Sequence, residues 1–241
     1  MRRYITLDVT NHLFRRPIQM HKVKMRAYFS TYHLWAAMHF ADECQAIENA
    51  HSGGSKFDIR HRALAIATIV ESGAFLESAI NELFKDCADG HPSYTNAISD
   101  TAVAALKTQW NDWHANGRVT KPTLEKFDAA IKCCIATPFD RGAVQYQDAS
   151  QVLMLRNAVM HFTPESTAAD EPNRFDRLKK KFKSNVLMDG TGNAYFPDKC
   201  LGAGSSRWAV EAVRRFADDF HARINATPNY MKSLLLPSSP A

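Results

Sequence analysis

The chain has 241 residues, of which 45% are hydrophobic and 23% charged, a composition that excludes collagen-like and low-complexity classes. Basic residues exceed acidic ones by 30 − 25 = 5, which permits a polyanionic partner without requiring one. The most apolar stretch, residues 63–70, is far shorter than the about 20 residues of a membrane span, so we expect no membrane association.

The cysteines do not follow a metal-binding spacing, because no two of them form a C-x2-C pair. We therefore expect reduced thiols in a cytoplasmic protein, with no metal site and no cofactor. The five cysteines are Cys44, Cys87, Cys133, Cys134 and Cys200.

Residues 1–27 form a basic leader with seven lysines and arginines. It lacks the apolar core of a signal peptide, and Asp8 interrupts it. Two interpretations stay open, a nucleic-acid-binding arm and a solvated leader.

Helical periodicity dominates the rest of the chain. Asp58 is the expected N-cap of the second helix, and Asp148 that of the fifth, with Gln151 three residues later. Only residues 4–9 alternate weakly, as a strand would. The predicted helices cover residues 28–50, 58–87, 96–114, 122–137, 148–163 and 206–226.

These helices predict an all-α fold, an antiparallel helical bundle in a single domain over residues 28–227. Residues 163–205 form an irregular basic insertion before the last helix, and residues 228–241 a flexible tail.

The second helix carries a carboxylate at an unexpected position. Glu77 falls in the middle of the apolar seam, whereas Glu71 and Glu82 point away from it and are expected to face solvent. An acid on a core face is costly unless it is paired. Either Glu77 has a partner, or the bundle opens there and the carboxylate reaches water.

The fifth helix is apolar nearly all round, which suggests that it is buried on more than one side, its second apolar side meeting either another helix of the same chain or a second copy of the protein. Arg156 lies on the flank of its apolar stripe, while Asn157 and His161 share the roughly opposite face. The R-x4-H spacing also occurs at Arg16 and His21, but a proline breaks that segment and we treat it as a decoy.

Residues 155–162, with residues 74–84 and the last helix, resemble HEPN-domain proteins. The chain is similar in particular to an uncharacterised bacterial group that shares Pro164-Glu165, Cys200-Leu201-Gly202 and Trp208-Ala209-Val210-Glu211. The resemblance covers residues 58–164 and 206–226. It implies a four-helix core, with the first helix as an addition, in a homodimer whose two motifs face a shared cleft.

Many members of that family are metal-independent endoribonucleases of toxin–antitoxin or antiviral defence systems, and others are catalytically silent. The resemblance therefore implies RNA as substrate and an antitoxin or nucleotidyltransferase-type partner. Thr163 stands where toxins silenced by AMP transfer carry a tyrosine, so silencing of that kind is not expected here.

The motif residues suit RNA cleavage. His161 can act as the base on a 2′-hydroxyl, Arg156 can stabilise the charged phosphate, and Asn157 can hold the phosphate or orient the imidazole. Glu77 is expected to pair with Arg156 or to hold His161 in place. The structural alternative is that Arg156 only neutralises a buried acid and His161 only caps the helix.

A second basic segment, residues 174–183, is expected to contact RNA. Phe175, Leu178 and Phe182 recur at helical spacing beneath its cations, although a merely solvated helix face has the same pattern. The candidate RNA-binding residues are Arg177, Lys179, Lys180, Lys181 and Lys183. The expected function is a metal-independent endoribonuclease; the alternative is a silent HEPN module that binds RNA, a nucleotide or a protein.

Overall fold

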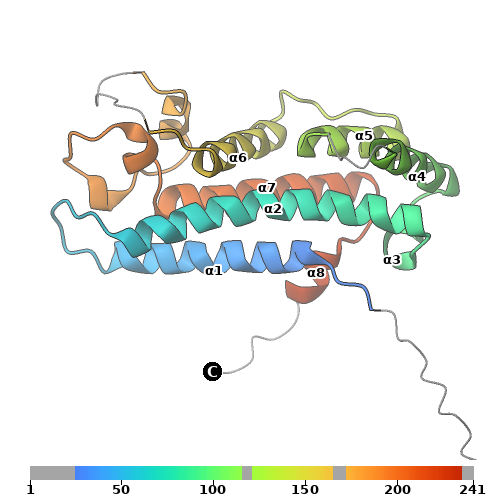
Figure 1. Ribbon diagram of the computed structural model, residues 1–241, viewed down its shortest axis with the longest axis horizontal. Coiled ribbons are helices and arrows are strands. Elements are labelled where there is room, and N and C mark those ends of the chain that lie inside the picture. The colour runs from blue at the N-terminus through green and yellow to red at the C-terminus, as the bar shows by residue number, and fades with distance from the viewer. Residues whose placement is uncertain (1–24, 116–120, 165–171, 235–241) are drawn as a thin grey trace, which may run out of the picture.

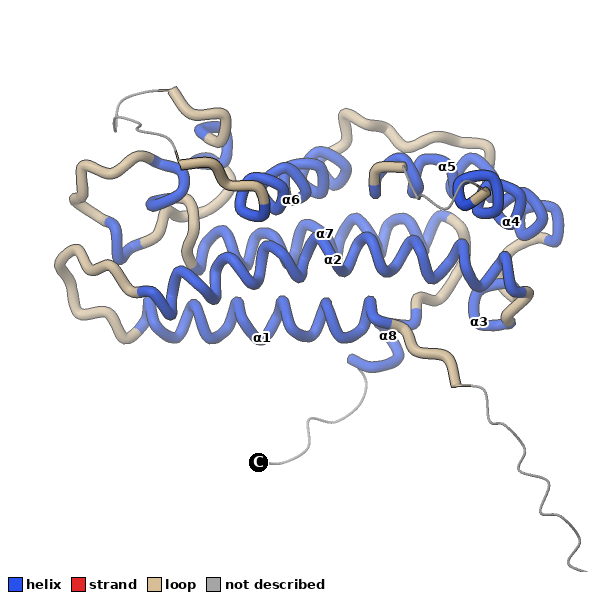
Figure 2. Tube along the Cα trace, viewed as in Figure 1, coloured by secondary structure: helices blue, strands red, loops and turns tan. Residues whose placement is uncertain are grey.

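The structure is a computed structural model that describes residues 25–115, 121–164 and 172–234. Helices connected by loops make up these residues, and none of the described segments is a strand (Figure 2). The all-α fold that the sequence predicts is thus confirmed. Residues 4–9, with their weak alternation, lie outside the described part.

Four long helices form the body of the molecule: α1 (Phe29–Asn49), α2 (Ile59–Asp89), α6 (Val144–Met160) and α7 (Ala203–Arg223). Both α2 and α7 contact α1, α6 and each other. In Figure 1, α1 and α6 run in one direction along the long axis, and α2 and α7 in the other. The first helix, expected as an addition to a four-helix core, is therefore itself one wall of the bundle.

Shorter elements complete the fold. The pair α4 (Asp100–His114) and α5 (Thr123–Ile135) packs on α2, beside the one-turn α3 (Pro92–Thr95). The insertion before α7 holds three short turns: η1 (Asp176–Lys180), η2 (Val186–Met188) and η3 (Tyr195–Lys199). Figure 1 places this insertion next to the C-terminal end of α6.

Both predicted N-cap residues can be compared with the structure. Asp58 caps α2 as expected, its Oδ1 accepting a hydrogen bond from the backbone N–H of His61 at 3.0 Å. Asp148 does not cap the fifth helix, because α6 begins four residues earlier, at Val144. The Asp148 carboxylate instead pairs with Lys181 Nζ at 2.8 Å, a partner that is distant in sequence.

The start of α7 is packed directly against the insertion. The carbonyl oxygen of Lys183 occupies the place where a Cβ on residue 204 would stand, so the two backbones meet at Gly204. The last helix begins at Ala203, three residues before the predicted start, so Gly204 lies in its first turn.

One hydrophobic cluster includes residues of all the described α-helices. It includes Tyr230 of α8 (Asn229–Leu234), which is 1% exposed and packs edge-on against Phe75 at 4.9 Å. Its hydroxyl donates to Asp218 Oδ1 at 2.9 Å. The prediction of a flexible tail is therefore wrong for α8, because an aromatic ring anchors it in the core.

At the other end of the described chain, Arg26 bonds to the C-terminal end of α2. Its guanidinium lies 2.6 Å from Asp86 and 2.8 Å from Asp89. The rest of the basic leader, residues 1–24, lies outside the described part.

Among the described helices, only α2 is long and apolar enough to cross a membrane by length and composition, with a mean hydropathy of 1.5 over its most apolar window. Half of that window is buried inside the protein. The buried core helix of a soluble protein passes the same test, and α2 packs against α1, α4, α6 and α7.

Candidate functional site

Arg156 reaches from α6 across α2 at a glycine. A Cβ on residue 73 would stand only 3.0 Å from Arg156 Nε and 3.1 Å from its Cγ, so Gly73 provides the space for this side chain. Arg156 Nη2 lies 3.5 Å from Glu77 Oε2, one turn further along α2. The predicted Glu77–Arg156 ion pair is therefore present.

Glu77 is paired but not buried. Its side chain is 45% exposed, and Lys126 Nζ of α5 lies 3.6 Å from its Oε1, so the carboxylate is placed between two cations. Both interpretations of the acid in the seam hold in part, because Glu77 has partners and also reaches water.

Lys126 is the unusual member of this cluster, because its side chain is only 1% exposed. Its Nζ donates to Asn81 Oδ1 at 2.9 Å, and burial lowers the pKa of the amine while Glu77 acts in the opposite direction. The sequence analysis missed this residue. The available signal was its position on α5, on the same helical face as Thr123 and Ala130.

Asn157 and His161 lie on the solvent-facing side of α6. Together with Met154, also exposed, they form a row at three- and four-residue spacing that ends at His161, the C-cap of α6. Arg156 is turned toward α2 instead, about 140° around the helix from His161. Within one chain, α6 thus presents His161 and Arg156 on different sides.

Glu71 and Glu82, the two acids of α2 that were expected to face solvent, are not free surface charges. Glu82 accepts from Ser30 N at 2.8 Å and from Ser30 Oγ at 2.7 Å, and its burial raises its pKa. Glu71 Oε2 lies 2.6 Å from His33 Nδ1. The reason is that α1 covers this face of α2.

The apolar side chains of the basic segment point inward and its cations outward. Phe175 and Leu178 are buried, and Phe182 packs partly against the core. Arg177 Nη2 lies 3.1 Å from Met154 Sδ, which brings this segment to the exposed row on α6. Only residues 176–180 of this segment are helical, and they form a short 3-10 helix.

The candidate RNA-binding lysines are not equivalent. Lys179 pairs with Asp176 at 2.8 Å, and Lys181 with the buried Asp148 at 2.8 Å. Neither Lys180 nor Lys183 forms an ion pair with another described residue. These two cations are therefore the ones available to a polyanion.

Residues of α1, the insertion and α7 line a cavity of about 490 Å³. Two aromatic rings at its wall, Phe182 and Trp208, lie 5.2 Å apart. Arg207 and Arg215 of α7 line this cavity together with lysines of the insertion, an arrangement that depends on tertiary packing and that no local sequence pattern reveals. The cations lining the cavity are Lys181, Lys183, Arg207 and Arg215, with Glu48 and Glu211 as acids.

Comparison of the chain with protein-family models, curated proteins and solved structures returns no match. The functional argument consequently depends on the geometry described above.

Proposed function

We propose that the protein is a metal-independent endoribonuclease that acts as a homodimer. The main support is the exposed row of Asn157 and His161 beside the basic segment, with Arg156 anchored on the neighbouring side of α6. A base open to substrate, a fixed guanidinium and nearby unpaired lysines are the groups that cleavage of an RNA strand requires.

In this mechanism His161 takes the proton of a 2′-hydroxyl, and the 2′-oxygen attacks the adjacent phosphorus. The bond to the 5′-oxygen breaks, which gives a 2′,3′-cyclic phosphate and a 5′-hydroxyl. Arg156 stabilises the charge on the phosphate oxygens, and Asn157 orients the phosphate or the imidazole.

A dimer supplies what one α6 lacks. Because Arg156 and His161 point to different sides of their helix, a second copy facing the first brings further cations and bases into one cleft. The second His161, when protonated, can return a proton to the leaving 5′-oxygen. We place this activity in a cytoplasmic toxin or defence system, restrained by an antitoxin or nucleotidyltransferase-type partner.

One observation favours a second candidate function, a catalytically silent module that binds RNA, a nucleotide or a protein. The charge of Arg156 is already opposed by Glu77 at 3.5 Å, which reduces the attraction that the guanidinium offers to a phosphate.

The deciding experiment incubates purified protein with mixed RNA in EDTA, with His161→Ala and His39→Ala beside the wild type. His39 is a matched control because it is also an exposed histidine, on α1. We expect cleavage with cyclic-phosphate ends by wild type and His39→Ala, and none by His161→Ala. Binding of RNA without cleavage by any of the three would establish the silent module instead, and equal cleavage by all three would exclude His161 as the base.

A further inference from the structure

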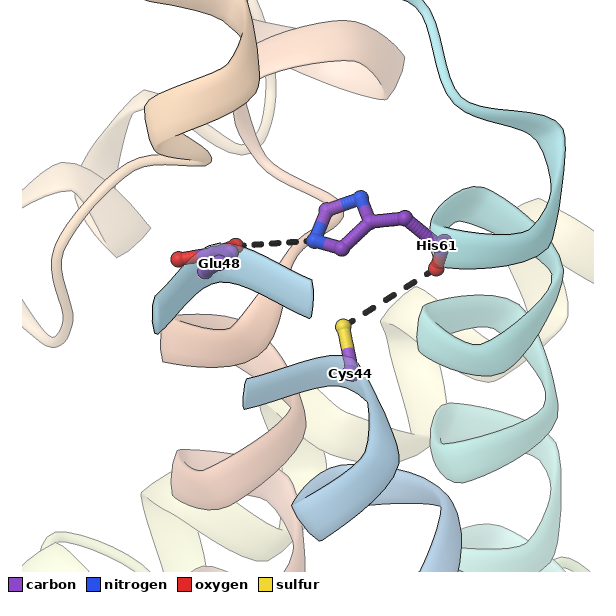
Figure 3. Close-up of side chains that lie close together, drawn as sticks. All are labelled: Cys44, Glu48 and His61. Atoms are coloured by element: carbon purple, nitrogen blue, oxygen red, sulfur yellow. Dashed lines mark hydrogen bonds and ion pairs between the residues drawn. The ribbon is translucent and has the colours of Figure 1, made fainter. Parts of the chain in front are cut away.

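Three side chains with metal-binding atoms meet where α1 ends and α2 begins. Cys44 and Glu48 are four residues apart on α1, so they share one face of the helix, and His61 comes from the first turn of α2. The thiol, a carboxylate oxygen and an imidazole nitrogen all lie within 4.8 Å of one another. Figure 3 shows the carboxylate of Glu48 and the ring of His61 facing each other, with the Cys44 sulfur near both.

This cluster is buried and connects three helices. Cys44 is 0% and His61 1% exposed, and the Glu48 side chain is 7% exposed. His61 Nε2 donates to Glu48 Oε1 at 2.9 Å, and the same oxygen accepts from the backbone N–H of Ala203, the first residue of α7, at 2.8 Å. No described residue donates to Glu48 Oε2.

We propose that Cys44, Glu48 and His61 bind a zinc ion. Sulfur, imidazole nitrogen and carboxylate oxygen form a mixed donor set that suits zinc, with a water molecule as the fourth ligand. Bonds of about 2.1 Å at tetrahedral angles place two ligand atoms about 3.4 Å apart, so His61 Nε2 and Glu48 Oε1, which lie 2.9 Å apart, separate by about 0.5 Å to admit the ion. The thiol reaches the ion with a displacement of about 1 Å.

Charge balance supports a divalent ion at this buried position. Zinc binding releases the thiol proton of Cys44, and His61 binds the ion through Nε2 as a neutral imidazole that carries its proton on Nδ1. The thiolate and the carboxylate then carry two negative charges that the ion neutralises, so no net charge is buried.

The ion has a structural role, because it fixes the end of α1 to the start of α2, and Glu48 extends the link to α7. His61 lies about 18 Å along α2 from Gly73, at 1.5 Å per residue, so this site is separate from the Arg156 cluster. The proposal is accordingly independent of the proposed RNA cleavage.

The test is a Co²⁺ titration of reduced, metal-free protein under nitrogen. We expect one equivalent to give a thiolate-to-cobalt charge-transfer band and tetrahedral visible bands, both removed by Zn²⁺. Cys44→Ser abolishes the charge-transfer band, and Glu48→Gln, which keeps an acceptor for the Ala203 N–H, weakens binding at least tenfold. Cys87→Ser, a buried cysteine elsewhere on α2, leaves the spectrum unchanged.

Thermal unfolding gives a second readout, since zinc should raise the Tm of wild type and Cys87→Ser but not of Cys44→Ser. The absence of a thiolate band in wild type overturns the proposal. An equal zinc-induced rise in Tm for Cys44→Ser also overturns the proposal, because zinc would then bind at other histidines of the chain. If Cys44→Ser does not fold, Glu48→Gln decides, because unchanged affinity in that variant excludes Glu48 as a ligand.

Discussion

The buried side chain of Lys126 determines how much Glu77 contributes to the stability of the fold. The buried ammonium has Asn81 and Glu77 as its neighbours, and Glu77 is also the anchor of Arg156. Removing the carboxylate therefore leaves a desolvated cation with only a neutral partner. The cost is moderated by solvent, because Glu77 is 45% exposed.

We predict that Glu77→Ala lowers the free energy of unfolding by about 1–2 kcal/mol, less than the full loss for a buried pair. In a Lys126→Met background the same change should cost clearly less, because the buried charge is gone. Urea denaturation of the four proteins measures this cycle. Equal costs in both backgrounds would contradict the pairing. Glu71 and Glu82 are unsuitable controls, because both have partners on α1.

His221 predicts a dependence of stability on pH. The ring is 1% exposed, its Nδ1–H donates to the Ala217 carbonyl at 2.8 Å, and burial lowers its pKa from 6.5 to about 4. Above pH 6.5 the ring is neutral in both the folded and unfolded chain. As the pH falls below 6.5, only the unfolded chain takes up the proton, so His221 costs up to about 3 kcal/mol by pH 4.

His221→Phe should remove this part of the acid sensitivity, since phenylalanine keeps an aromatic ring beside Tyr94 and has no titrating group. Urea denaturation at pH 7.5 and pH 4.5 provides the comparison. Parallel losses of stability in wild type and variant would show that the ring is protonated in the folded protein.

At the scale of an element, we expect different lysines of the basic segment to contribute to folding and to RNA binding. We predict that Lys180→Glu/Lys183→Glu weakens RNA binding about tenfold or more at low salt and flattens its salt dependence, while the Tm is nearly unchanged. Fluorescence anisotropy with labelled RNA at several salt concentrations, beside thermal unfolding, measures both effects.

Lys181→Glu is the informative comparison, because it places an acid next to the buried Asp148 and should lower stability as well. If the Lys180/Lys183 variant binds RNA with unchanged affinity at every salt concentration, the basic segment does not contact RNA and is only a solvated surface.

Helix positions were predictable to the extent that local signals specify them. Asp58 is followed directly by an apolar-periodic run, and the predicted cap is present. Asp148 carries the same local signal, but Lys181, more than 30 residues away, pairs with it and α6 extends past it. The error at Glu82 has the same cause, since its partner Ser30 belongs to another helix.

The candidate site was predictable in its pairing but not in its burial. Helical-wheel geometry placed Glu77 and Arg156 toward each other, and their ion pair is present. The exposure of Glu77 and its contact with Lys126 depend on how the first turn of α5 packs beside α2, which the pattern of a single helix does not specify.

At the scale of the whole molecule, two exposed apolar surfaces compete as interfaces. The end of α6 exposes Met160 at 55% and Phe162 at 50%. The outer face of α1 exposes Phe29, Tyr32 and Trp35 at 58%, 63% and 63%. Patches of this kind mark contact surfaces, and only the first adjoins His161.

We predict a dimer of the 27.1 kDa chain in light scattering at micromolar concentration. Met160→Glu/Phe162→Glu should give a monomer, because charges would be buried in the α6 interface. Trp35→Glu, a change of the same kind on α1, should leave the dimer intact. A monomeric wild type, or dissociation by Trp35→Glu alone, would exclude an interface at α6.

The contact between the Lys183 carbonyl and Gly204 has a consequence for how freely the two positions can vary. The backbone of residue 183 excludes any side chain at residue 204, whereas the Lys183 side chain is exposed and takes no part in that contact. In a library randomised at both positions and selected only for folded protein, residue 204 should return glycine and residue 183 nearly any amino acid. Selection of the same library for RNA binding should then enrich lysine and arginine at residue 183 alone, which separates the requirement of the fold from that of the ligand.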